Sequence, residues 1–80
     1  MSKTSTILYF GQITDYTLVS EESIDWGDLT VAEFSKRIEA QYPGLTHTFY
    51  RIAVDQKIRD EEFTISEGSE IAVLPQFAGG

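Results

Sequence analysis

Leu29-Thr30-Val31-Ala32-Glu33-Phe34-Ser35-Lys36-Arg37-Ile38-Glu39-Ala40-Gln41-Tyr42 is the stretch that decides the fold, because it predicts the main helix of the chain. Thr30 as N-cap and Glu33 three residues later form a capping box, which satisfies backbone N–H groups that a helix start leaves unpaired. Four apolar side chains then recur at helical spacing and form one stripe: Val31, Phe34, Ile38 and Tyr42. Pro43-Gly44 ends the helix.

Apolar runs on both sides of this helix predict the strands of a sheet. Before the helix, residues 6–13 and 16–20 are expected to pair as antiparallel strands, with the acidic residues 21–28 forming a turn. After it, strands are expected over 49–54, 57–59 and 70–74. This ββαββ pattern, with the short strand 57–59 added, and one main helix covering one face of a mixed sheet predict an α+β fold of the β-grasp type. We expect residues 1–80 to form a single domain, with residues 1–5 disordered.

Composition excludes several classes of function. A net charge of −7 argues against nucleic-acid backbones and anionic membranes, and it favours partners with basic docking surfaces. Because the chain has no cysteine, disulfides, thiolate metal sites and thiol catalysis are excluded. No apolar run approaches the roughly 20 residues of a membrane span, and the polar start does not resemble a signal peptide. We therefore expect a cytoplasmic protein.

Residues that could carry chemistry are scattered along the chain. His47 is the only histidine, and no triad or metal cluster can be assembled around it, so we expect a solvated loop residue. The acidic residues 60–62, with Glu67 and Glu70, lack the spacing of a calcium loop and are expected to form a solvated face. Trp26 is expected to cover the edge of the core. We expect no metal and no bound cofactor.

The C-terminus is the exception. Pro75 is expected to stop the last strand, so that residues 75–80 form a flexible arm ending in Gly79-Gly80. Glycine has no Cβ, and a partner's active site could therefore reach the terminal carboxylate through a narrow channel. A carboxylate is a weak electrophile until it is joined to AMP, after which sulfur or an amine can attack the carbonyl. A frayed terminus is the alternative, but the arm follows the strand directly and this continuity favours function.

Several segments carry a resemblance to a known family: Ile7-Leu8-Tyr9-Phe10-Gly11-Gln12, Leu29-Thr30-Val31, Ala53-Val54-Asp55-Gln56, Glu67-Gly68-Ser69-Glu70-Ile71, Pro75 and Gly79-Gly80. From about Thr6 to Gly80 the chain resembles MoaD, the small ubiquitin-like sulfur-carrier subunit of molybdopterin synthase. A Gly-Gly end is shared with ThiS-type thiamine carriers and with ubiquitin-like modifiers. The aromatic first strand followed by Gly-Gln, and the chain length, favour the MoaD type. Gln76 stands where the family often has a second proline, and Asp55 where asparagine is common.

The resemblance implies a cycle through two complexes. A MoeB-like adenylating enzyme would activate Gly80 with ATP, and a sulfurtransferase would deliver the sulfur that converts the glycyl adenylate to a thiocarboxylate. The carrier would then dock on the MoaE-like large subunit, within a heterotetramer, and give its sulfur to the pterin precursor. Catalytic side chains are expected on that large subunit, so this chain alone is expected to be inactive.

The same resemblance indicates which residues contact partners. Gly80 is the reactive end with Gly79 before it, and the arm residues Pro75, Phe77 and Ala78 are expected to enter a partner's pocket.

A docking patch is expected on the sheet. At positions matching the family's hydrophobic patch stand Phe10, Ile58 and Leu74. One helix can cover only one sheet face, which favours an exposed patch at these three positions, whereas Leu8 is expected in the core. Two alternatives remain open: a carrier for another pathway or a modifier that forms isopeptide bonds with lysines, and a binding module whose Gly-Gly end is incidental.

Overall fold

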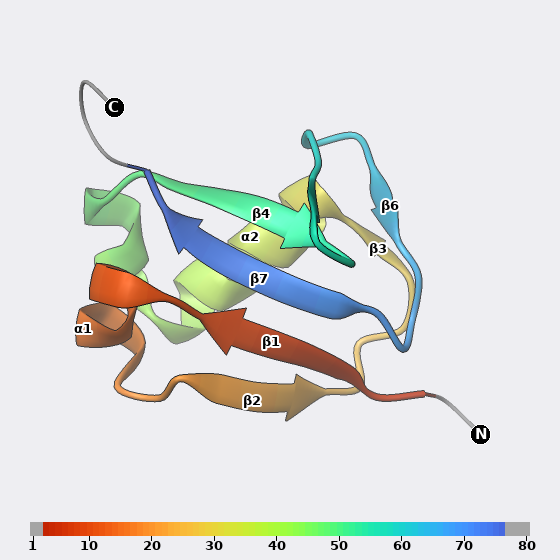
Figure 1. Ribbon diagram of the computed structural model, residues 1–80, viewed down its shortest axis with the longest axis horizontal. Coiled ribbons are helices and arrows are strands. Elements are labelled where there is room, and N and C mark those ends of the chain that lie inside the picture. The colour runs from red at the N-terminus through yellow and green to blue at the C-terminus, as the bar shows by residue number, and fades with distance from the viewer. Residues whose placement is uncertain (1–2, 77–80) are drawn as a thin grey trace.

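The computed structural model describes residues 3–76, which build a five-stranded mixed sheet with one helix packed behind it (Figure 1). In spatial order the strands are β2 (Glu21–Ile24), β1 (Ser5–Tyr9), β7 (Glu70–Pro75), β4 (Tyr50–Val54) and β5 (Lys57–Ile58). β1 and β7 run parallel, and the other neighbouring pairs are antiparallel. The helix, α2 (Val31–Gln41), covers only one face of the sheet. The predicted α+β fold of the β-grasp type is confirmed.

The helix forms as its sequence predicts. The Glu33 N–H donates to Thr30 Oγ1 at 3.1 Å, and the Thr30 N–H donates to Glu33 Oε1 at 2.8 Å, which completes the capping box. Of the predicted stripe, Val31, Phe34 and Ile38 are buried and Tyr42 is partly buried against the core. α2 therefore turns its apolar side onto the sheet.

Smaller elements surround this frame. A two-stranded sheet of β3 (Leu29–Thr30) and β6 (Thr64–Ile65) lies at the start of α2. Short helical turns η1 (Gly11–Ile13) and α1 (Thr14–Thr17) follow β1, and η2 (Pro43–His47) follows α2. Figure 1 shows α1 and η2 at the end of the molecule where β7 finishes.

The inner face of the sheet, defined as the face turned toward α2, is fully packed. Its buried side chains are Ile7, Tyr9, Ile52, Val54, Ile71 and Val73. Trp26 is partly buried, and its ring lies 5.9 Å from that of Phe34, centroid to centroid. The expectation that Trp26 covers the edge of the core is confirmed.

The chain between β1 and α2 differs from the sequence prediction. The first strand ends at Tyr9 instead of residue 13, because Gly11 takes a left-handed conformation (φ +54) and turns the chain into η1. Residues 16–20 are not a strand. The second strand is Glu21–Ile24, within the segment expected to be a turn.

β2 was missed because its inward residues are not both apolar. Ile24 is buried, but the other inward position is Glu22, opposite Ile7. Its carboxylate accepts hydrogen bonds from the Tyr9 hydroxyl at 3.0 Å and the Tyr42 hydroxyl at 2.7 Å. These partners are distant in sequence, so the local pattern lacks the apolar alternation that marks a strand.

The two ends of the chain also correct the prediction. Ser5 is not disordered: it is buried in β1, where its Oγ accepts a hydrogen bond from the Gly68 N–H at 3.0 Å. Met1 and Ser2 lie outside the described residues. The last strand continues through Pro75, which pairs with Tyr50, so the described chain contradicts an arm that begins at Pro75.

A proline is tolerated in this central strand because β1 has already ended beside it. Phe10 donates its N–H to the Val73 carbonyl at 3.1 Å, and Gly11 then turns the chain away. Two residues beyond Val73, Pro75 needs no donor on that side because no further strand residue faces it. A Cβ on Gly11 would lie only 3.2 Å from Pro75 Cγ. The end of β1 and the end of β7 therefore pack closely against each other.

Candidate functional site

The outer face of the sheet, turned away from α2, is also apolar. Strand register aligns Leu8 with Ala72, Ala72 with Ala53, and Ala53 with Ile58 in one row across four strands. The next row, one step closer to the end of β7, pairs Leu74 with Arg51. Phe10 continues β1 with extended backbone (φ −112, ψ 151) and reaches this second row beside Leu74. We define the outer face by seven residues: Leu8, Phe10, Arg51, Ala53, Ile58, Ala72 and Leu74.

The three predicted docking residues all lie on this face. Phe10 is 44% exposed, Ile58 is 56% exposed and Leu74 is half-buried. Leu8 shares the face and is only half-buried, so the expectation that it belongs to the core is wrong. Strand alternation is the reason: Ile7 and Tyr9 point inward, and Leu8 between them must point outward.

Further exposed apolar side chains, not singled out by the sequence, lie near the second row. Phe49 is 80% exposed, and it precedes β4 at a position that alternates with Arg51 and Ala53. Val19 is exposed and comes next to Phe10 across β1 and β2, since the Tyr9 N–H donates to the Ser20 carbonyl at 2.9 Å. The alternation of 49, 51 and 53 was the signal that could have identified Phe49.

Leu18 carries two unfavourable features at once. It is 84% exposed, and it caps α1 in the left-handed region with φ 63. For a residue with a Cβ, this backbone conformation costs roughly 1–2 kcal/mol. Glycine is the usual residue at such a helix end. Packing within the described chain does not account for a leucine there.

The root of the C-terminal segment lies at the same end as these side chains. The Gln76 N–H donates to the Phe49 carbonyl at 3.2 Å, which extends the pairing of β7 with β4 beyond Pro75. The other predicted residues of the tail, Phe77, Ala78, Gly79 and Gly80, lie outside the described residues. The central strand β7 therefore leads to Gln76, the last described residue, at the end of the molecule that carries Phe10, Leu74 and Phe49. The segment that ends in Gly-Gly begins at the next residue.

Comparison with known proteins assigns the family. A model of the ThiS family matches residues 7–80. The chain belongs to the ThiS family. This ThiS-family chain is 32% identical over 80 residues to the human molybdopterin synthase sulfur carrier subunit, with 92% of this chain and 91% of the human protein covered. The resemblance to the MoaD and ThiS carriers is confirmed.

Solved structures share the fold of this ThiS-family chain. The putative molybdopterin converting factor, subunit 1, from Pyrococcus furiosus matches with a TM-score of 0.82 at 18% identity, covering 95% of this chain and 100% of that one. Small archaeal modifier protein 1 of H. volcanii matches with a TM-score of 0.79 at 15% identity, covering 94% and 99%. At these identities the likeness shows the β-grasp fold alone.

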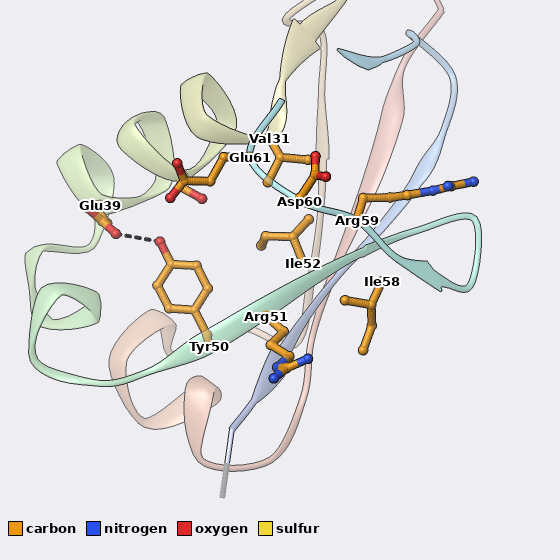
Figure 2. Close-up of a pocket in the computed structure, with 10 residues that line it drawn as sticks. Val31, Glu39, Tyr50, Arg51, Ile52, Ile58, Arg59, Asp60 and Glu61 are labelled. Carbon is orange, nitrogen blue, oxygen red and sulfur yellow. Dashed lines mark hydrogen bonds between the residues drawn. The ribbon is translucent and has the colours of Figure 1, made fainter. Parts of the chain in front are cut away.

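A depression of about 660 Å³ on this ThiS-family chain lies between α2, β4 and residues 58–61 (Figure 2). The Tyr50 hydroxyl donates to Glu39, and burial together with this carboxylate raises the pKa of Tyr50 to about 12. The phenol therefore stays protonated at neutral pH. The guanidinium of Arg59 stacks on the Phe63 ring at 4.4 Å. Tyr50, Glu39 and Arg59 thus make structural contacts, although the buried Nε of Arg59 has no hydrogen-bond partner within residues 3–76. The depression is a poor candidate for an active site.

The remaining candidates from the sequence stay in solvent. His47 and the acidic residues 60–62 are exposed, as expected. Within residues 3–76, no group of three or more potential ligands is placed to hold a metal ion. No helix in this part of the chain is long and apolar enough to cross a membrane. The outer face and the root of the C-terminal segment are therefore the candidate functional site.

Proposed function

We propose that this chain is a sulfur-carrier subunit of molybdopterin synthase. The observation that carries the proposal is an exposed apolar face beside the root of a Gly-Gly terminus. Exposed apolar surface of this kind is typical of a protein–protein interface. The likeness to the human carrier subunit, over nearly the whole of both chains, supports the choice of pathway.

The chemistry takes place at Gly80. An adenylating enzyme joins the terminal carboxylate to AMP with release of pyrophosphate, and this supplies a good leaving group. Sulfur delivered at the sulfide level by a sulfurtransferase system then attacks the glycyl carbonyl, the bond from the carbonyl carbon to AMP breaks, and AMP leaves with its electron pair, so that a thiocarboxylate remains. Because the chain has no cysteine, the terminal sulfur has no thiol of the same chain to compete with it. The glycyl adenylate and the thiocarboxylate are transient covalent states, with no resident cofactor.

The outer face provides the docking surface for both steps. The adenylating enzyme and the large subunit of the synthase bind Phe10, Ile58 and Leu74, and each receives the tail in its own pocket. The large subunit holds the pterin precursor and the catalytic side chains, and two copies of each subunit form a heterotetramer. Since both partners use one face, loading and donation must alternate.

Intact mass tests the proposal. The full chain is incubated with ATP, a MoeB-like enzyme and a sulfur source, and we expect the mass increase that replacement of one oxygen by sulfur produces. The loaded chain is then mixed with the large subunit and the cyclic pterin precursor, and molybdopterin should form. A chain lacking Gly80 should keep the same thermal midpoint and gain no sulfur. Activity only in a thiazole-forming system, or only conjugates on lysines, would contradict the proposal.

A further inference from the structure

The outer face carries one basic side chain, Arg51. It is exposed on β4, with Leu74 opposite it on β7 and Ala53 as its neighbour on the same side of its own strand. Figure 2 shows Tyr50 directed toward Glu39 of α2 and Arg51 leaving β4 in the opposite direction. Among residues 3–76, no carboxylate forms an ion pair with its guanidinium. Within residues 3–76 this charge is therefore unpaired, and it lies beside apolar residues of the outer face.

Two acidic residues lie on this sheet face outside the row of Arg51, and Glu39, Asp60 and Glu61 line the depression that Arg51 also lines. Glu21 is opposite Leu8 at the β2 edge, and Glu70 is opposite Thr6 at the far end of β7. The apolar row that contains Ala72 separates Glu70 from the row that contains Arg51. Among the seven residues that define the outer face, Arg51 is therefore the only charged one, on a chain with a net charge of −7.

Docking through this face must remove Arg51 from water. Directly opposite residues of neighbouring strands have Cβ atoms about 4.5–5.5 Å apart, so a partner that covers Leu74 also covers the base of Arg51. A desolvated guanidinium is costly unless an anionic or polar acceptor replaces its hydration. Its planar fork of donors matches a carboxylate in bidentate geometry.

We propose that, when the carrier docks, Arg51 forms an ion pair with an aspartate or glutamate that the large subunit of the synthase presents within its apolar docking surface. This inference rests on the proposed function. Apolar contact between two flat faces is non-directional, whereas a bidentate pair fixes register. Because Leu74 and Arg51 lie next to the strand end at Pro75, this pair fixes the point at which the tail enters the partner.

Charge reversal tests the pair, with a matched control on the opposite side of the molecule. Arg51→Glu and Lys36→Glu change the net charge equally, and Lys36 is exposed on α2, away from the outer face. Calorimetry with the large subunit should show binding at least about thirtyfold weaker for Arg51→Glu, since losing one partner of a buried charge pair costs about 2–5 kcal/mol. Lys36→Glu should change the affinity less than about threefold, in the range of an exposed surface charge.

A second set of variants identifies the partner's carboxylate. Each acidic residue around the large subunit's docking surface is changed in turn to arginine, and one of these changes should restore the affinity of Arg51→Glu. Arg51→Met keeps an apolar stem and removes the charge, which separates loss of pairing from repulsion; we expect weaker binding than for the unchanged chain. Thermal midpoints of all carrier variants should remain unchanged because both altered side chains are exposed.

The outcomes separate this inference from the proposed function. If the unchanged chain neither gains sulfur nor binds the large subunit, the proposed function fails. If the unchanged chain does both, and Arg51→Glu binds as Lys36→Glu does or no charge swap restores binding, the ion pair is wrong. Dimerisation of the carrier through Arg51, seen by sedimentation, would assign the face to a second copy and would also overturn the inference.

Discussion

Along residues 71–74 of the central strand β7, both faces of the sheet carry apolar side chains, but the surroundings of the two faces differ. Along β7, Ile71 and Val73 point inward and are fully buried beneath α2, whereas Ala72 and Leu74 point outward and stay partly exposed. The fold accounts for the inner residues, because burial of apolar surface is its main source of stability. It does not account for the outer ones. This difference supports the docking role that we propose for the outer face.

Matched truncations on one strand give the largest expected effect on stability. Ile71→Ala should lower the free energy of unfolding by about 2–5 kcal/mol, the range for a fully buried isoleucine. Leu74→Ala should cost about 1 kcal/mol, since its side chain is already partly in solvent. Urea denaturation of both variants measures the contrast, and equal losses would show that the outer face is structural.

A charged residue on the outer face should weaken partner binding strongly and change folding stability little. Phe10→Glu is expected to weaken binding to the large subunit by at least about 2 kcal/mol, because a carboxylate would be buried without a partner. Phe10 is already 44% exposed, and the thermal midpoint should fall little. Calorimetric affinity and thermal melting are compared on the same sample. A variant that unfolds instead would place Phe10 in the core.

Unfolding at alkaline pH tests the contact between α2 and the inner face of the sheet, where the Tyr50 hydroxyl meets Glu39. The folded-state pKa of Tyr50 is raised to about 12 from an ordinary value of 10.0, chiefly by burial and then by the Glu39 contact. Since the folded state holds this proton more tightly than the unfolded chain, the stabilisation is complete below pH 10 and is lost as pH rises toward 12.

Replacing Tyr50 should therefore reduce the loss of folding stability at alkaline pH. Urea denaturation at pH 8 and pH 11 measures the free energy of unfolding. Its decrease between the two pH values should be smaller for Tyr50→Phe than for the unchanged chain. Burial and Glu22 raise the pKa of Tyr9 and of Tyr42 as well, so part of the decrease should remain. Tyr16→Phe, which removes a hydroxyl group at an exposed position of α1, is the matched control variant.

The smallest expected effect concerns Leu18. Leu18→Gly should raise the free energy of unfolding by about 0.5–1 kcal/mol, because glycine adopts a positive φ without the penalty of a Cβ. If this exposed leucine contributes to docking, the same variant should bind the large subunit more weakly although it is more stable. Increased stability with unchanged affinity would limit the docking surface to the sheet.

Sequence predicted the parts of the fold whose signals are local. The capping box fixed the start of α2, and the run ending at Leu74 identified the last strand. β2 was not predictable in this way, since Glu22 takes an inward position only through hydroxyl groups of Tyr9 and Tyr42. The apolar residues Leu18 and Val19 were mistaken for part of a strand, because local patterns do not distinguish an exposed apolar loop from a buried strand.

The residues of the candidate site likewise fall into two groups: those that the sequence predicts and those that only the pairing of the strands reveals. Phe10, Ile58 and Leu74 were predicted as a patch because they match the family's hydrophobic positions and because a single helix leaves the other side of the sheet open. Strand register places all three on one face. Leu8 was misassigned to the core although strand alternation places it on the same side as Phe10. Arg51 and Phe49 became part of the site only once β4 was seen to pair with β7, since neither is unusual within its own segment.

The position of β7 between β1 and β4 has a mechanical consequence. Ladder hydrogen bonds run across the strands, roughly perpendicular to a force applied along β7 from its end. Traction on the chain beyond Gln76 therefore loads the bonds to both neighbours together, in shear, whereas an edge strand such as β5 could be peeled away bond by bond. In the proposed function, an adenylating enzyme binds the terminal glycine in a channel. Any force that it applies then acts along β7, the direction in which the hydrogen bonds of this sheet resist separation most strongly.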